Sequence, residues 1–190
     1  MSIKDKEKWN EKYTKTPTLL KDRPQSNKLV DVLKYTKGNK ALDVACGAGR
    51  NSIFLAKNDF LVDSIDISKV ALKALDDKNI SNIHTKIVDL DNFEIEQNKY
   101  DLIIMTNFLD RKIIPKLKKA LKENGILFIE TYMNHKENEK TPSNPDFLLE
   151  KNELKSFSDD SMEIIEYDEF LNEDFEKFKM GKQLIIMKKI

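Results

Sequence analysis

Two closely spaced glycines are the first residues of this sequence whose type and spacing suggest chemistry. Gly47 and Gly49 lie three and five residues after the end of the apolar run 40–44, in a chain of 190 residues that has five glycines in all. Glycine accepts positive φ angles and leaves room for a ligand to approach the backbone. A helix expected over 50–57 would direct its free N–H groups and positive dipole end at this turn. The pattern predicts a nucleotide-binding turn at the carboxyl end of a first parallel strand.

Two carboxylates flank this turn in the sequence. Asp66 follows the second apolar run, 60–65, and lies 19 residues after Gly47, where Rossmann-like sheets place the acid that binds ribose hydroxyls. The alternative that Asp66 only ends a strand or approaches a helix cap stays open. Asp43 lies four residues before Gly47, where a negative charge suits a ligand with a cationic end and repels a pyrophosphate. The acids therefore favour a ligand that carries both a ribose and a positive charge.

Short β-rich runs alternate with helical segments along the chain. The expected strands are 40–44, 60–65, 83–88, 99–105 and 125–132, and the expected helices are 50–57, 68–78 and 111–123. Ser68 and Asp110 are typical N-cap residues, and Gly125 is expected to end the last helix before its strand. Residues 162–170 and 182–189 are expected to pair antiparallel at the sheet edge. The alternation predicts an α/β domain with a parallel sheet covered by helices.

The composition argues against several classes of partner. Lys and Arg together number 33, as do Asp and Glu, so the formal net charge is zero and no basic excess favours a nucleic-acid partner. The single cysteine cannot form an internal disulfide, and with only two histidines the chain does not suggest a metal site. No apolar run approaches the ~18 residues of a membrane span, and no signal peptide is recognisable. We expect a cytoplasmic protein without nucleic-acid, membrane or metal partners.

Four segments resemble the class I S-adenosylmethionine (SAM)-dependent methyltransferases, and in particular their tellurite-resistance (TehB-like) branch. They are 43–51 (DVACGAGRN), 108–111 (FLDR), 130–132 (ETY) and 144–149 (NPDFLL). The resemblance covers most of residues 9–170. It implies a Rossmann-like α/β fold with a mostly parallel seven-stranded sheet, helices on both faces and a C-terminal antiparallel strand pair. It also implies SAM as the methyl donor and S-adenosylhomocysteine (SAH) as the product.

The resemblance implies a donor site with three parts. Asp66 would bind the ribose, and Ile67 would pack against the adenine. Asp89 would accept a hydrogen bond from the adenine amine beside the backbone N–H of Leu90. Asp91 is a competitor for this role, and a turn or capping role for Asp89 is the alternative. The residues assigned to the methionine end of the donor are Asp43, Ala45, Gly47, Gly49 and Arg50.

A candidate acceptor pocket lies after the fourth expected strand, where the methyl group should emerge. Its candidate residues are Tyr13, Asn107, Arg111 and Tyr132, and Asn107 is also a candidate donor contact. Arg50 is assigned to the donor carboxylate or to the acceptor, with a solvent-facing first-turn position as the alternative. Spacing alone marks no residue as a general base.

We expect methyl transfer to a small molecule, with a thiol or a chalcogen oxyanion as acceptor. A nicotinamide-dependent Rossmann oxidoreductase and a non-catalytic SAM-binding regulatory protein stay open as alternatives. The chain is expected to form one domain, 1–190, as a monomer or homodimer, with a core over 37–190. Residues 1–36 are expected to form a helical lid, because Trp9 and Tyr13 fall on one helical face. The alternative is that Trp9 only anchors this helix to the core.

Overall fold

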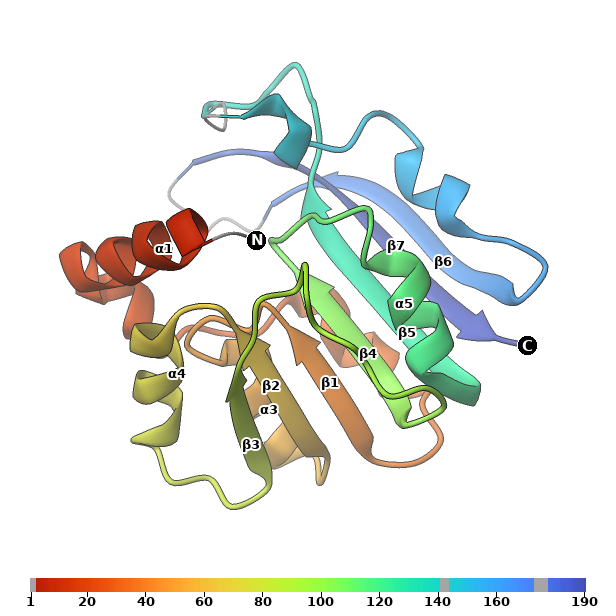
Figure 1. Ribbon diagram of the computed structural model, residues 1–190. Helices are drawn as coiled ribbons and strands as arrows, with labels where there is room; N and C mark the ends of the chain where they lie inside the picture. Colours follow the sequence, from red (N-terminus) through yellow and green to blue (C-terminus); the bar gives the residue numbers. More distant parts are fainter. Residues whose placement is uncertain (1–2, 141–143, 173–177) are drawn as a thin grey trace.

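A single sheet of seven strands organises the protein, for which a computed structural model describes residues 3–140, 144–172 and 178–190 (Figure 1). The strands are β1 (Lys40–Val44), β2 (Leu61–Asp66), β3 (Ile83–Ile87), β4 (Tyr100–Thr106), β5 (Leu121–Tyr132), β6 (Met162–Leu171) and β7 (Gly181–Lys189). Their order is β3-β2-β1-β4-β5-β7-β6. The first five are parallel, whereas β7 is antiparallel to both β5 and β6. The predicted mostly parallel sheet with a C-terminal antiparallel pair is confirmed.

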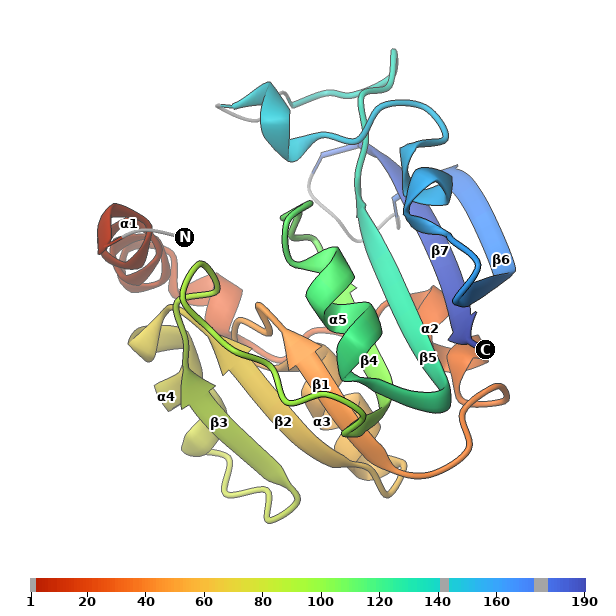
Figure 2. The same ribbon diagram turned by 45° about the vertical axis from the view of Figure 1, so that its right-hand side comes forward.

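Helices cover both faces of the sheet (Figure 2). They are α1 (Ile3–Lys15), α2 (Asn27–Val32), α3 (Arg50–Lys57), α4 (Lys69–Asp76) and α5 (Ile114–Ala120), with 3-10 turns η1 (Pro17–Leu20), η2 (Pro145–Phe147) and η3 (Glu153–Phe157). Leu29 of α2 and Leu55 of α3 belong to the apolar core on one face. Leu117 of α5 and Leu154 of η3 belong to the core on the other. A sheet covered by helices is the arrangement that the alternating sequence pattern predicts.

The region around α5 differs from the sequence-based expectation. The helix begins at Ile114 and ends at Ala120, inside the predicted range 111–123. Asp110 is not its N-cap, because the Asp110 carboxylate accepts a hydrogen bond from the Lys112 N–H (2.9 Å) in the turn ahead of it. Gly125 does not end the helix but lies within β5, where a Cβ would approach the Lys122 carbonyl oxygen to 2.8 Å. The glycine thus allows a close backbone approach rather than a helix C-cap.

The sheet order brings the carboxyl ends of β2, β1 and β4 side by side. The chain reverses its direction of progress between β1 and β4, and ligands bind at such switch points in open α/β sheets. Helix α1 lies beside α4 at this edge (Figure 1). The Asn10 side-chain oxygen accepts hydrogen bonds from the Ser68 hydroxyl (2.9 Å) and the Val70 N–H (3.3 Å). Ser68 also caps α4 as predicted, by accepting from the Ala71 N–H.

Candidate functional site

The two glycines of the turn after β1 have different surroundings. Gly47 (φ +56°) and Gly49 (φ +78°) both adopt the left-handed conformation. A Cβ on Gly47 would lie 2.7 Å from the Tyr13 hydroxyl oxygen, so this glycine keeps open the space between the turn and α1. A Cβ on Gly49 would instead lie 2.5 Å from the Leu75 side chain of α4. Gly47 therefore faces a possible ligand, and Gly49 permits close packing of the turn on a helix.

Asp66, at the end of β2, is tied to the same turn by its carboxylate. One oxygen accepts the Gly47 N–H and the other accepts the Ser68 N–H, each at 2.8 Å. Burial raises the pKa of Asp66, and backbone hydrogen bonds from Ser68, Gly47 and Ile67 oppose this effect. A carboxylate has about four acceptor positions. Asp66 therefore retains capacity to accept the two hydroxyl hydrogens of a ribose.

Asp43 lies beneath the turn, and its residue is 1% exposed. It accepts a hydrogen bond from the Ser52 hydroxyl (2.6 Å), which in turn accepts one from the Ser64 hydroxyl (2.8 Å). Burial raises the pKa of Asp43 to about 7, against the lowering effects of the Ser52 hydrogen bond and the Arg50 charge. The side chain thus supports the turn from within the core.

A cleft of about 630 Å³ opens over the turn, within the range typical of small-molecule sites. Its walls come from the loops after β1, β2 and β4, the end of β5 and the N-terminal segment, by which we mean residues 3–25. The predicted site residues that line it are Tyr13, Ala45, Gly47, Arg50, Asp66, Ile67, Asn107 and Tyr132. The predicted site residues outside its lining are Asp43, Gly49, Asp89, Leu90 and Arg111.

Asp89 is engaged in a turn of its own after β3. Its carboxylate accepts hydrogen bonds from the Asp91 N–H (3.1 Å) and the Asn92 side-chain amide (3.4 Å). Leu90 is 4% exposed and belongs to the apolar core. Asp89 thus makes the turn contacts that were the alternative to adenine recognition, and its contact with the adenine amine stays a prediction.

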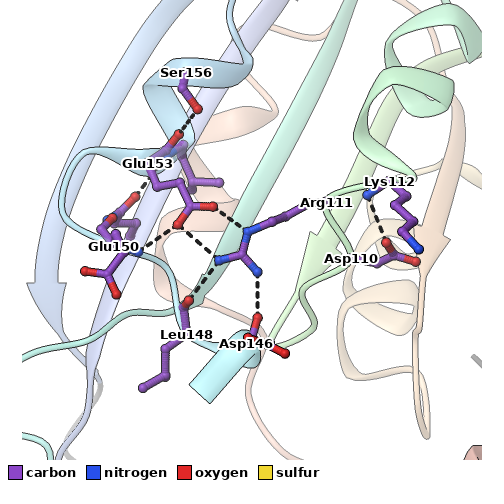
Figure 3. Close-up of polar contacts among 10 residues, drawn as sticks. Asp110, Arg111, Lys112, Asp146, Leu148, Glu150, Glu153 and Ser156 are labelled. Atoms are coloured by element: carbon purple, nitrogen blue, oxygen red, sulfur yellow. Dashed lines mark hydrogen bonds and ion pairs between the residues drawn. The ribbon is translucent and has the colours of Figure 1, made fainter. Parts of the chain in front are cut away.

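Arg111 is held away from the cleft by a set of polar contacts (Figure 3). Its guanidinium binds both carboxylate oxygens of Glu153, with Nε–Oε1 at 2.5 Å and Nη2–Oε2 at 3.1 Å. The same group donates to the carbonyl oxygens of Asp146 (2.6 Å) and Leu148 (3.0 Å). This is the planar, bidentate recognition to which arginine is suited. Arg111 thus fastens the loop 145–153 instead of contributing to an acceptor pocket.

The N-terminal segment contributes an aromatic wall. Trp9 and Tyr13 both line the cleft, with ring centroids 5.9 Å apart, and the Lys12 ammonium lies 4.2 Å from the Trp9 ring centroid. Burial, together with the Asp66 charge, raises the pKa of the Tyr13 hydroxyl. Tyr13 is therefore a neutral phenol at physiological pH, in contact with the turn.

The cleft is also predominantly cationic. Six basic side chains line it against two acidic ones: Lys12, Lys21, Arg23, Arg50, Lys57 and Lys78 against Asp22 and Asp66. Arg50 is the most informative of these, because its Nη2 is buried and has no hydrogen-bond partner among the residues that the structure describes. Buried guanidinium groups ordinarily have partners. Sequence reasoning missed this cationic lining, since single lysines of a lysine-rich chain give no positional signal.

The sheet order, the glycine turn and the Asp66 contact define a class I methyltransferase fold. The family described as "Tellurite resistance protein TehB" matches residues 1–188, and the chain belongs to that family. The resemblance that the sequence motifs indicated is confirmed.

Relatives and solved structures agree with this assignment. A protein of Haemophilus influenzae named "Probable S-adenosyl-L-methionine-dependent methyltransferase TehB" is 32% identical over 155 residues, which are 76% of this chain and 53% of the relative. A crystal structure of TehB from the same organism matches 96% of this chain and 67% of its own, with 25% identity and a TM-score of 0.77. A ribosomal protein L11 methyltransferase of Campylobacter lari is 31% identical over 105 residues, 53% of this chain and 38% of the relative.

The chain spans about half the length of the TehB relative it matches. Within the described ranges, no helix is long and apolar enough to cross a membrane. The same ranges contain no grouping of three or more His, Cys, Asp or Glu side chains placed to hold a metal ion.

Proposed function

We propose that this protein is a SAM-dependent methyltransferase whose acceptor is a small molecule, either a thiol or a chalcogen oxyanion. The observation that carries the proposal is the pairing of Asp66 with the Gly47 turn in a cleft of a TehB-family chain. Gly47 leaves space where a Cβ would intrude, and Asp66 offers free acceptor positions, so the residues present suit a donor with a ribose. When bound, SAM supplies a methyl group on an electrophilic sulfonium.

The donor contacts follow from the lining of the cleft. Asp66 accepts from the ribose hydroxyls, and Ile67, which follows it, packs against the adenine ring. The backbone around Ala45 and Gly47 binds the methionine end. Arg50, with its unpartnered Nη2, binds an anionic group, either the donor carboxylate or the acceptor. Asp43 acts on this end from below, through the turn.

The acceptor itself supplies the nucleophile, so the reaction requires a correctly positioned acceptor and no nucleophilic side chain. A thiolate or an oxyanion attacks the methyl carbon directly, so the protein's task is to hold it in line and to exclude water. Tyr13, Asn107 and Tyr132 form the walls in which we place the acceptor. The excess of basic side chains around the cleft favours an anionic acceptor and raises its local concentration.

The N-terminal segment is proposed to act as the lid of this cleft. Trp9 and Tyr13 cover the turn, and Asn10 fastens α1 to the start of α4. The second helix of residues 1–36 differs from α1, because Leu29 and Val32 of α2 are fully buried in the sheet core. The proposed lid therefore comprises residues 3–25, and α2 is its anchor.

Ligand-dependent thermal stabilisation tests the donor. SAM and SAH should each raise the melting temperature, because a ligand that binds only the folded state stabilises it by mass action. NADH at the same concentration should leave the melting temperature unchanged. A folded Gly47→Val variant is the matched control and should not respond to SAH. Stabilisation by NADH without any response to SAM would overturn the proposal in favour of an oxidoreductase.

Turnover tests the transferase activity itself. Purified protein with methyl-labelled SAM is offered 2-mercaptoethanol, selenite or tellurite, and both the labelled methylated product and SAH are followed. We expect SAH to form with at least one of these acceptors and to depend on Arg50, with Arg50→Lys retaining more activity than Arg50→Met. Tight SAH binding without turnover on thiol or oxyanion acceptors would refute the proposed acceptor class and favour a binding protein.

A further inference from the structure

A fully buried ion pair lies at the carboxyl end of β5, next to the cleft but outside its lining. Glu130 and Lys182 are each 0% exposed, and the Lys182 ammonium lies 3.1 Å from one Glu130 carboxylate oxygen. Lys182 is directly opposite Tyr132 in the β5–β7 register. The proposed methyl transfer uses neither charge directly, so the pair needs another explanation.

The second Glu130 carboxylate oxygen accepts a hydrogen bond from the Ser26 hydroxyl. Ser26 is itself 0% exposed, and it joins the N-terminal segment to α2. The Ser26 N–H donates to the side-chain oxygen of Asn51 (3.2 Å), and the Asn51 amide donates to the Thr106 hydroxyl (2.8 Å). Ser26 thus joins the Glu130 carboxylate to the start of α3, and Asn51 extends this chain of hydrogen bonds to the end of β4.

The pair also reaches two walls of the cleft. The Lys182 ammonium lies 5.2 Å from the centroid of the Tyr132 ring, within cation–π range. The Glu130 carbonyl oxygen accepts the Asn107 N–H at 2.8 Å, and Asn107 has a left-handed backbone (φ 54°). Both Tyr132 and Asn107 line the cleft. The N-terminal segment and Tyr132 therefore contact the two buried charges, and Asn107 contacts the backbone of Glu130.

A buried ion pair gives little net stability over a well-packed apolar pair, because both charges must be desolvated. Its directional hydrogen bonds instead fix the relative position of the groups that it joins. Here those groups are the wall after β4, the wall after β5 and the anchor of the N-terminal segment.

We propose that Glu130 and Lys182 are positioning residues for methyl transfer. Through Ser26, Asn107 and Tyr132, they fix the relative positions of the walls at the acceptor end of the cleft. This inference rests on the proposed function. It assigns the pair to the acceptor side, because its contacts described above go to Ser26, Tyr132 and Asn107, whereas Asp66 and the Gly47 turn are proposed to hold the donor.

Ser26 offers the sharpest test, because Ser26→Ala removes the link to the N-terminal segment and leaves both charges paired. We expect the kcat/KM for the acceptor that the wild type turns over, tested first with tellurite and 2-mercaptoethanol, to fall about tenfold, the effect of a small misplacement of reacting groups. SAH affinity, measured by calorimetric titration, should stay within about twofold because the donor contacts are intact. Ser26→Thr keeps the hydroxyl and should restore kcat/KM.

Tyr100→Phe is the matched control. The Tyr100 hydroxyl donates to the Asp63 carboxylate (2.8 Å) at the opposite end of the same sheet, so the variant also loses one hydroxyl–carboxylate hydrogen bond. It should keep wild-type kcat/KM. An equal loss of kcat/KM in Tyr100→Phe and Ser26→Ala would overturn the inference and leave Ser26 with a general stability role.

Amide hydrogen exchange gives a readout that does not depend on activity. Exchange in residues 17–25 should accelerate in Ser26→Ala and in the charge-free double variant Glu130→Gln/Lys182→Met, but not in Tyr100→Phe. If the wild type has no turnover, the proposed function fails while this exchange pattern still tests the positioning role. Wild-type exchange together with wild-type kinetics in Ser26→Ala would refute the inference.

Discussion

Replacing Asp43 by asparagine should change how the stability of this protein depends on pH. Asp43 is buried under the glycine turn, where its carboxylate accepts a hydrogen bond from the Ser52 hydroxyl at 2.6 Å. An asparagine has nearly the same shape, and its amide oxygen accepts the same hydrogen bond. The substitution therefore removes the ionisation of residue 43 with little change in packing.

The direction of the effect follows from proton linkage. Burial raises the pKa of Asp43 from 3.8 to about 7 in the folded protein. The folded state therefore binds this proton more tightly than the unfolded state, and stability is lost as pH rises from about 4 to about 7. One pKa unit corresponds to about 1.4 kcal/mol. Between pH 4.5 and pH 8 the wild type should lose about 3 kcal/mol relative to Asp43→Asn.

Urea denaturation of both proteins at several pH values measures this difference directly. The variant should be the more stable protein at pH 8, and its advantage should shrink toward pH 4.5. In thermal melts the change amounts to about 6–12 °C for a domain of this size. Other carboxylates titrate equally in both proteins and cancel in the comparison. Parallel pH profiles for the two proteins would refute the argument, because they would show that Asp43 ionises alike in the folded and unfolded states.

Three further substitutions and one spectroscopic signal follow from the site. Asp66→Ala should weaken SAH binding by about one to two powers of ten, the effect of one or two charged hydrogen bonds; wild-type affinity in calorimetric titration would remove Asp66 from the site. Gly47→Val should remain folded by circular dichroism and lose SAH binding, and normal binding would contradict the proposed turn contact. Arg111→Ala should cost about 1–3 kcal/mol in urea denaturation while SAH affinity stays unchanged, because its partners lie outside the cleft. Trp9 fluorescence should shift on addition of SAH, and an unchanged spectrum would leave the N-terminal segment as a fixed brace.

The sequence was sufficient for the sheet and for the pairing of the Gly47 turn with Asp66. The β-rich run, the Gly47 turn and Asp66 are local signals, whose positions relative to one another are set by a single β-α-β unit. Prediction was weaker where local patterns overlap. Leu121 pairs with Tyr100 as part of β5, although its spacing also continues the apolar face of α5. The helix therefore ends earlier than its hydrophobic periodicity indicates.

The acceptor side depends on contacts between residues far apart in the chain. Arg111 was predicted to face the acceptor, yet its partner Glu153 is 42 residues away and holds it elsewhere. Glu130 and Lys182 are separated by 52 residues, and no spacing rule joins them. The available signal was a charge at the end of an apolar strand, as in Glu130 after Ile126–Ile129. Such a charge indicates a buried partner but does not identify it.

The proposed donor site and the proposed lid share one carboxylate, which would couple them. Asp66 accepts the Gly47 N–H on one side and the Ser68 N–H on the other. Ser68 in turn donates its hydroxyl hydrogen to Asn10 of α1, while the Tyr13 hydroxyl lies over Gly47. A ribose that binds Asp66 therefore acts on the groups to which the N-terminal segment is fastened. Loss of Asp66 should loosen this segment even without a donor, whereas loss of Ser26 should loosen it only from its other end.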